Sequence, residues 1–202
     1  MKIYDITQEV FSSMVYPGDP SPARHILSAV SKGDKYNLTA FSMCAHNGTH
    51  IDAPSHFIDG AGGIDRVAPE RFVGAAAVVT HSGDLNASDA ERLLDMCEKL
   101  DTGAAKRILF RKNTVITAEA ARVLAERGVY LVGVESQSVG PVDSPMEVHV
   151  ILLSRGIVLL EGIRLSDVPD GIYFLSAAPI LLADSDGAPC RALLIERDGF
   201  WK

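Results

Sequence analysis

The feature that most constrains the fold is a change of hydrophobic period that repeats along the middle of the chain. "RFVGAAAVVTHSG" (residues 71–83) is an unbroken apolar run typical of a buried strand, whereas "ASDAERLLDMCEKL" (87–100) has the spacing of an amphipathic helix. "KRILFRKN" (106–113) then predicts a strand, "TAEAARVLAERG" (117–128) a helix and "VYLVGVE" (129–135) another strand. This alternation predicts an α/β fold with a largely parallel section.

Two residues mark the ends of the predicted helices. Ser88 is the expected N-cap of the first helix, and Gly128 is expected to end the second.

The segments on either side of this alternation modify the predicted fold. "MVYPGDPSP" (14–22) predicts a loop. In "GIYFLSAAPILLADSDGAPCRALLIER" (171–197), two apolar runs around the turn-forming "DSDG" predict an antiparallel hairpin, with its aspartates as turn residues. The sequence therefore predicts a mixed β-sheet flanked by helices.

Composition sets the wider class of protein. A chain of 202 residues that is 47% hydrophobic and 22% charged, without repeats or linkers, predicts a single domain over residues 1–202. The net charge of −7 and the lack of basic runs argue against nucleic acid or an anionic membrane as the main partner, so small molecules are expected. No signal peptide or spanning segment is recognisable, and three scattered cysteines show no paired spacing. We expect a cytoplasmic protein with reduced thiols.

The stretch "AHNGTHIDAPSHF" (45–57) holds three of the six histidines and an aspartate. Its "NGT" breaks a helix and favours a turn between His46 and His50, and in an extended chain His50 and Asp52 point the same way. The proline that follows bends the chain before His56. Nitrogen and carboxylate donors without thiolate suit zinc, manganese or iron, and three protein ligands leave positions open for catalysis. The alternative, in which these histidines only cap turns and complete hydrogen bonds, is less favoured at this spacing.

A second pair of candidate ligands brackets the apolar stretch "HVILLSRGIVLLEGI" (149–163). Glu161 lies among aliphatic residues, where burying a carboxylate is costly unless a cation partners it. His149 opens the same stretch. From these residues alone, Glu161 can equally lie exposed at the end of a strand, since glutamate is usually exposed.

Taken together, these residues resemble the cyclase family of metal-dependent hydrolases, which includes bacterial kynurenine formamidases (arylformamidases) and isatin hydrolases. The similarity rests above all on "HNGTHIDAPSHF" and extends to "YPGD", "LVGVESQSV", "HVILLSRGIVLLEG" and "APILLADSDGAPCRALLI", so it covers most of the chain. It implies a mixed sheet flanked by helices, of the swivelling β/β/α type, and assembly into homodimers or larger homo-oligomers.

The resemblance also implies roles for residues. It assigns two groups of metal ligands, of which His46, His50 and Asp52 hold the first ion and Asp52, His149 and Glu161 hold a second ion in two-zinc members. His56 matches the proton-transferring histidine of the family, so it is the expected general acid and base. Zinc is the expected cofactor, as one or two ions, and manganese is the alternative.

The chemistry expected of such a site is hydrolysis of a C–N amide bond. A divalent metal lowers the pKa of water from near 16 to about 7, and proton transfer by His56 is typically worth about 10²–10⁴-fold in rate. The resemblance implies N-formyl-L-kynurenine as substrate, giving kynurenine and formate in tryptophan catabolism. Three residues depart from the family pattern: Tyr16 replaces a tryptophan that lies against the substrate ring, and Glu135 and Gly140 replace aspartates.

Two alternatives remain at this point. One is isatin hydrolase-like opening of a cyclic amide, usually with manganese. The other is a metal-binding protein without turnover, such as a sensor or store, and the presence of His56 argues against it because neither role requires a proton donor.

Overall fold

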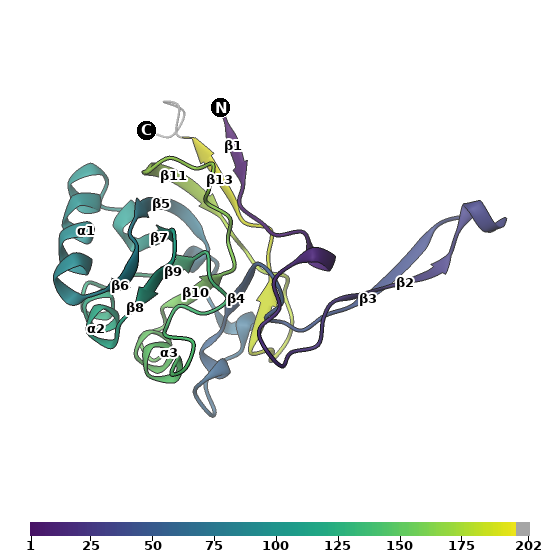
Figure 1. Ribbon diagram of the computed structural model, residues 1–202, viewed down its shortest axis with the longest axis horizontal. Helices are drawn as coiled ribbons and strands as arrows, with labels where there is room; N and C mark the ends of the chain where they lie inside the picture. The colour runs from purple at the N-terminus through teal and green to yellow at the C-terminus, as the bar shows by residue number, and fades with distance from the viewer. Residues whose placement is uncertain (197–202) are drawn as a thin grey trace.

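The computed structural model describes residues 1–196, and its largest element is a nine-stranded sheet in the order β1-β13-β11-β5-β7-β9-β10-β4-β12 (Figure 1). Its strands are β1 (Ile3–Asp5), β4 (His50–Asp52), β5 (Val73–Thr80), β7 (Arg107–Arg111), β9 (Leu131–Val134), β10 (Val158–Glu161), β11 (Gly171–Ser176), β12 (Gly187–Pro189) and β13 (Leu193–Glu196). The four central strands β5, β7, β9 and β10 run parallel, and all other pairs in this sheet are antiparallel. The predicted mixed sheet is therefore confirmed.

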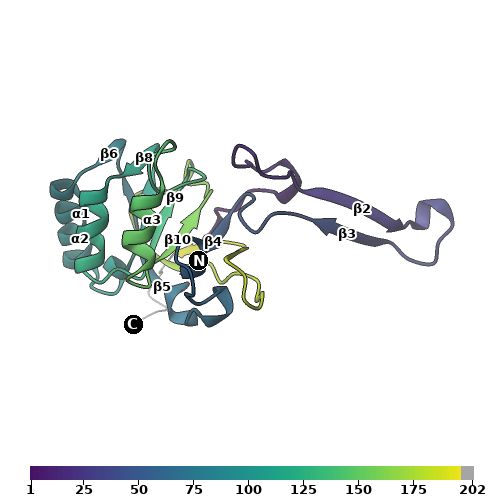
Figure 2. The same ribbon diagram turned by 90° about the horizontal axis from the view of Figure 1, so that it is seen from below.

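Three helices lie side by side along one face of this sheet (Figures 1 and 2). They are α1 (Ala87–Leu100), α2 (Ala118–Glu126) and α3 (Met146–Leu153). A short parallel pair, β6 (Gly83–Leu85) with β8 (Thr114–Ile116), lies beside them. Within residues 1–196, no helix combines the length and the apolar character needed to cross a membrane.

The central strands are buried on both faces, which explains their unbroken apolar sequences. In β7, Ile108 and Phe110 pack in the cluster that contains the helices, whereas Leu109 packs in a second cluster on the other face. The second cluster, on the opposite face of the sheet, includes Ile51 of β4 and Leu160 of β10. Both strands that carry candidate ligands are therefore anchored by core residues on the face away from the site.

Most local predictions in the middle of the chain are confirmed, but the cap of α1 is not. Asn86 is the N-cap, because its backbone is extended and its side chain accepts a hydrogen bond from the backbone N–H of Asp89. Ser88 lies inside the first turn, where its hydroxyl is not needed for this contact. Gly128 does follow the end of α2, in the left-handed conformation (φ 66°) expected there.

The C-terminal hairpin prediction is partly wrong. Strands β11 and β13 do pair antiparallel, with Leu175 opposite Leu194. "DSDG" does not join them, however, because β12 crosses to the other edge of the sheet and pairs with β4. Pro179 and Pro189 cannot donate to a strand ladder, so the chain between β11 and β13 does not run as a continuous hairpin. The last residue of the predicted segment, Arg197, lies outside the described residues.

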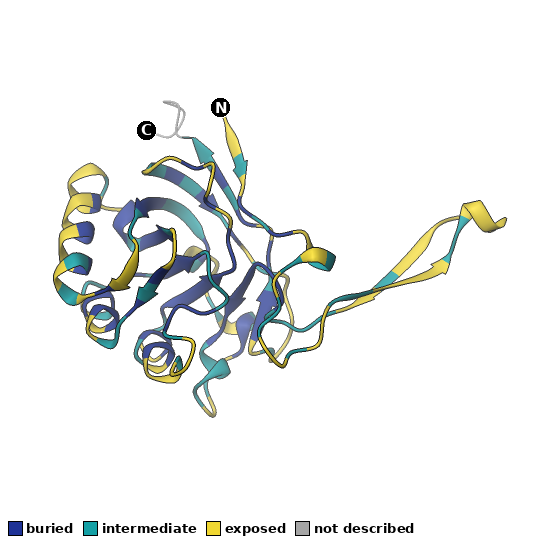
Figure 3. Ribbon diagram, in the orientation of Figure 1, coloured by how far each residue is buried: buried dark blue, intermediate teal, exposed yellow. Residues whose placement is uncertain are grey.

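Among the elements that were not predicted from the sequence, one projects from the protein. Strands β2 (Ala23–Ser28) and β3 (Leu38–Ser42) form an antiparallel hairpin that projects away from the rest of the protein (Figures 1 and 2). Most of its residues are exposed (Figure 3). We call residues 23–42 the arm.

Candidate metal centre and active site

Strand β4 places His50 and Asp52 on one face of the sheet. Ile51 between them points to the opposite side into the core, as the alternation along a strand requires. On the neighbouring strand β10, Glu161 lies directly opposite His50 in the antiparallel register, so the two side chains share a face. Glu161 is only 2% exposed. The interpretation of this carboxylate as buried is confirmed, and the alternative of an exposed strand end is excluded.

Helix α3 brings His149 to the same place. Its Nδ1–H donates to the backbone carbonyl of Pro145 at 2.8 Å. The other ring nitrogen, Nε2, lies 3.4 Å from Oε1 of Glu161 and 3.6 Å from Oδ2 of Asp52. Since a carbonyl oxygen only accepts, this contact fixes the proton on Nδ1 and directs Nε2 at the two carboxylates.

His50 is held in the same way. Its Nδ1–H donates to the carbonyl of Gly48 at 3.0 Å, and its Nε2 lies 3.3 Å from Oδ1 of Asp52 and 3.5 Å from Oε2 of Glu161. A neutral imidazole would therefore direct a lone pair at two carboxylates. This arrangement is stable only when a cation, either a proton or a metal ion, lies between these groups.

His46 lies in the turn that precedes β4 and contacts two carboxylates. Its Nδ1 is 2.9 Å from Oδ1 of Asp52, and its Nε2 is 3.0 Å from Oδ2 of Asp186. The ring packs against Gly187, where a Cβ atom would lie 2.7 Å from Cε1 of the imidazole. His46 must give up one of its two hydrogen bonds in order to bind a metal.

His56 lies between this cluster and solvent. It ends a short 3₁₀ helix (Pro54–His56), and its ring stacks on that of His46 with 4.0 Å between the centroids. Its Nδ1 lies 3.5 Å from Oδ2 of Asp186. The side chain is 27% exposed, more than that of any of the five ligand candidates, so it can exchange protons with water.

Asp186 is a residue of the site that the sequence did not reveal. It contacts both His46 and His56, although it comes more than 120 residues later in the chain and looked like a turn residue. The pairing of β12 with β4 brings it there, because Gly187 lies opposite Asp52. No local pattern signals this position, since it depends on the unpredicted crossing of β12.

The pKa values of the site residues are set by burial and by the charges of neighbouring groups. Burial by itself lowers the pKa of His50, but hydrogen bonds and charges from Asp52 and Glu161 outweigh it and raise that pKa to about 10. Burial also opposes ionisation of Asp52, yet His46 and His50 hold the pKa of its carboxyl well below the usual range. For His56 burial prevails and lowers its pKa, so this imidazole is neutral at pH 7.

The donor set fits a divalent metal. Oδ2 of Asp52 is buried and has no hydrogen-bond partner within the described residues. Ligand atoms around a four-coordinate zinc, each about 2.1 Å from the ion, are separated by roughly 3.4 Å. The four separations between Nε2 of His50 or His149 and the carboxylates range from 3.3 to 3.6 Å.

Within residues 1–196, three groups have ligand atoms that all lie within 4.8 Å of one another: His46, His50 and Asp52; Asp52, His149 and Glu161; and His46, His56 and Asp186. The first two are the groups that the resemblance implied, and they share Asp52. The structure therefore places the predicted ligand residues close together, and the third group adds Asp186.

A cavity of about 380 Å³ opens onto this cluster, and we call it the inner cavity. His56, His149 and Glu161 line its floor, and Tyr16 lines it as well, with its hydroxyl donating to the carbonyl of Val142 at 3.4 Å. Glu135 is not among the lining residues. Its carboxylate instead accepts hydrogen bonds from two backbone N–H groups, so this departure from the family pattern has a structural role.

Comparison with known proteins identifies relatives along nearly the whole chain. The family described as "Putative cyclase" matches residues 4–141. The kynurenine formamidase of Salinibacter ruber is 34% identical over 96% of this chain and 97% of its own, and that of Bordetella petrii is 32% identical over 96% and 98%.

Solved structures share the fold. A potential metal-dependent hydrolase with cyclase activity superposes with a TM-score of 0.79 at 28% identity, covering 98% of both chains. Isatin hydrolase A from Ralstonia solanacearum has a TM-score of 0.80 over 96% of this chain and 92% of its own, and at 24% identity it supports the fold alone. With a family match over most of its length, a ligand cluster built from β4, β10 and α3, and relatives above 30% identity, this chain belongs to the cyclase family of metal-dependent hydrolases.

Proposed function

We propose that this protein is an arylformamidase, which hydrolyses the C–N amide bond of N-formyl-L-kynurenine to give L-kynurenine and formate. One observation carries the proposal: Oδ2 of Asp52, a buried carboxylate oxygen with no hydrogen-bond partner within the described residues, lies among imidazole and carboxylate groups, most of which line the inner cavity. Kynurenine formamidases are the relatives at 34% and 32% identity reported above, which supports this substrate.

The ligand groups define where metal would bind. His46, His50 and Asp52 would hold one ion, and Asp52, His149 and Glu161 would hold a second. Zinc suits these nitrogen and oxygen donors, and manganese is the alternative. When bound, a divalent metal supplies two things, a lower pKa for water and polarisation of the amide carbonyl.

His56 performs the proton transfers in this proposal. Its neutral imidazole accepts a proton as the water oxygen attacks the carbonyl carbon. The same group then returns that proton to the amide nitrogen as the C–N bond breaks, so the amine leaves uncharged. Asp186 lies 3.5 Å from Nδ1 of His56 and stabilises the imidazolium formed between the two steps.

Tyr16 is the proposed contact for the aryl group. It lines the inner cavity, and its ring offers a flat apolar face while the hydroxyl remains bonded to the carbonyl of Val142. The free thiols of all three cysteines support the further proposal that the enzyme works in the cytoplasm, in tryptophan catabolism.

The test combines elemental analysis with an absorbance assay. Purified protein is analysed for zinc and manganese, and the hydrolysis of N-formylkynurenine and of isatin is followed after loading with each metal. The proposal expects at least one bound ion per chain and turnover of N-formylkynurenine. Turnover of isatin alone would transfer the assignment to ring opening of a cyclic amide, and a metal-loaded protein that hydrolyses neither would refute the substrate.

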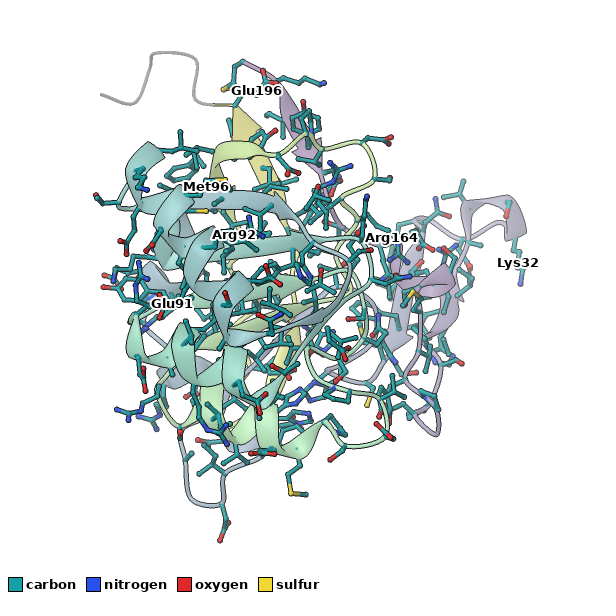
Figure 4. All side chains as sticks on the ribbon, turned by 60° about the vertical axis from the view of Figure 1, so that its left-hand side comes forward. Lys32, Glu91, Arg92, Met96, Arg164 and Glu196 are labelled. Carbon is teal, nitrogen blue, oxygen red and sulfur yellow. The ribbon has the colours of Figure 1, made fainter. Side chains whose placement is uncertain are left out.

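We further propose that the arm mediates homodimerisation. It carries Ile26, Leu27, Tyr36 and Phe41, each more than half exposed, and a projecting apolar surface of this kind is typical of a protein–protein contact. In Figure 4, Lys32 marks the end of the arm and Met96 lies on α1 on the other side of the protein.

The oligomeric state can be measured by light scattering coupled to size-exclusion chromatography. The double variant Ile26→Glu/Leu27→Glu is expected to be monomeric, because it introduces four charges into the two arms of a dimer. Met96→Glu, which changes an exposed apolar residue away from the arm, serves as the control and should remain dimeric. A dimeric arm variant, or a monomeric wild type, would contradict the proposal.

A further inference from the structure

A second cavity of about 360 Å³ adjoins the inner cavity, and we call it the side cavity. Tyr16, Gln137 and Ser138 line both cavities, so the two lie side by side and share part of their walls. The other lining residues of the side cavity are mostly apolar: Met14, Val15, Pro17, Val115, Ser136, Gly140 and Val142. A molecule bound at the metal centre can therefore extend an apolar group into this space.

Within the described residues, two buried polar atoms without a hydrogen-bond partner belong to residues that line both cavities. Ser138 is only 7% exposed, and its Oγ has no hydrogen-bond partner within the described residues. Oε1 of Gln137 is also buried and unpaired, while its Nε2 donates to the carbonyl of Gly48. Buried polar atoms of this kind are costly unless a ligand or water completes them.

With metal bound, the imidazoles of the ligand histidines would be neutral, so the charges of the protein around both cavities would come from carboxylates. The lining residues of the two cavities within residues 1–196 include no lysine or arginine, whereas Asp19, Glu161 and Asp186 are all lining carboxylates. Asp52 lies beneath them. Two divalent ions would only neutralise these four carboxylates, and one ion would leave an excess of negative charge. A bound carboxylate would therefore meet no compensating cation beyond the metal centre.

We infer that the side cavity binds the aryl group of the substrate, and that the enzyme discriminates against aryl formamides that carry net negative charge. This inference rests on the proposed function and narrows its substrate class to neutral, zwitterionic or cationic aryl formamides. N-Formylkynurenine satisfies it, because its ammonium group balances its carboxylate. Hydrolysis of such an amide adds water across the C–N bond and gives the uncharged amine, formate and one proton, which passes to water, so the negative charge leaves on formate and the amine in the apolar cavity stays uncharged.

The test uses two substrates that differ in charge and hardly in shape. 2-Formamidobenzamide carries a neutral carboxamide beside the formamide, and 2-formamidobenzoate carries a carboxylate at the same position. The full chain, loaded with zinc or with manganese, should hydrolyse the benzamide with a kcat/KM at least about tenfold above that of the benzoate. Calorimetry on the two products, 2-aminobenzamide and 2-aminobenzoate, gives a binding readout that is independent of turnover.

Val142 allows the charge of the side cavity to be changed. Its side chain is 73% exposed at the cavity wall, and the hydrogen bond from Tyr16 uses only its backbone carbonyl, so a long side chain is tolerated. Val142→Arg supplies a cation and should reduce the preference for the benzamide by about tenfold relative to Val142→Gln, which is similar in length but neutral. Met96→Arg adds the same charge on α1 and should leave the preference unchanged.

The outcomes distinguish a failure of the inference about the side cavity from a failure of the proposed function. If the wild type hydrolyses the benzoate as fast as the benzamide and binds both products equally, the inference is wrong while the arylformamidase assignment stands. If Val142→Arg and Val142→Gln show the same preference, the side cavity does not receive the aryl group. If neither formamide nor N-formylkynurenine is hydrolysed with either metal, the proposed function itself fails.

Discussion

Replacing Gly187 with alanine would place a methyl group in space that the His46 ring occupies. The added Cβ would lie 2.7 Å from Cε1 of His46 and 2.8 Å from the carbonyl oxygen of Ile51. Ile51 belongs to β4, which is paired on both sides, so its backbone cannot move without breaking a ladder. The imidazole is therefore the group that can move, and since carbon atoms in contact are normally at least about 3.5 Å apart, its shift is roughly 0.8 Å, while the short contact with the Ile51 carbonyl remains.

Such a displacement has two measurable consequences. Overpacking of this kind costs about 1–3 kcal/mol of unfolding free energy, which corresponds to a fall in Tm of about 2–12 °C for a chain of this length. Because catalytic groups need placement within about 0.5 Å, we expect metal affinity to fall by about 10–100-fold and kcat/KM by about a hundredfold.

The assays are thermal unfolding by circular dichroism, competition of zinc with a chromogenic chelator, and hydrolysis of N-formylkynurenine. Gly171→Ala is the matched control on β11, because its Cβ would meet only Tyr173 at an ordinary 3.5 Å. A Gly187→Ala protein with wild-type Tm and wild-type metal affinity would refute the reasoning that the close packing of Gly187 positions His46.

Three further predictions concern the centre itself. His56→Ala should lower kcat by about 10²–10⁴-fold while the metal content stays the same, and a folded variant that loses its metal would show that His56 is a ligand. Glu161→Gln should reduce the number of bound ions by one, as measured by mass spectrometry of the native protein, and unchanged metal content would exclude the second group of ligands. Metal affinity should rise with pH between about 6 and 9, because the pKa of His50 is raised to about 10 in the metal-free chain and its proton must leave before the metal binds; affinity independent of pH would contradict this.

The sequence was sufficient to predict the part of the site whose residues lie close together in the chain. His50 and Asp52 share a face because they lie two apart in a strand, and this relation is visible in the spacing alone. Glu161 was ambiguous, because an apolar neighbourhood in sequence does not show what covers a carboxylate. Its register opposite His50 resolves that question, and register between strands distant in the chain is a tertiary property.

The missed features share a physical cause. Asp186 reaches the site only because β12 pairs with β4 rather than continuing a hairpin, and that choice depends on which edge of the sheet is free. The sequence of α3, "MEVHVILL", is apolar around most of the helix circumference. It therefore lacks the amphipathic period that would distinguish a helix from a strand. The arm has exposed apolar residues on both strands. The order of apolar and polar residues along these strands therefore does not indicate a buried face.

The central claim is that ligands from β4, β10 and α3 hold a divalent metal that the enzyme uses in hydrolysis. The most direct measurement is an anomalous difference map at the zinc absorption edge, from crystals of protein that is active in solution. We predict a peak within about 2.3 Å of a carboxylate oxygen of Asp52, in contact with a histidine nitrogen. An active, metal-loaded protein whose only anomalous peaks lie away from Asp52 would contradict the account.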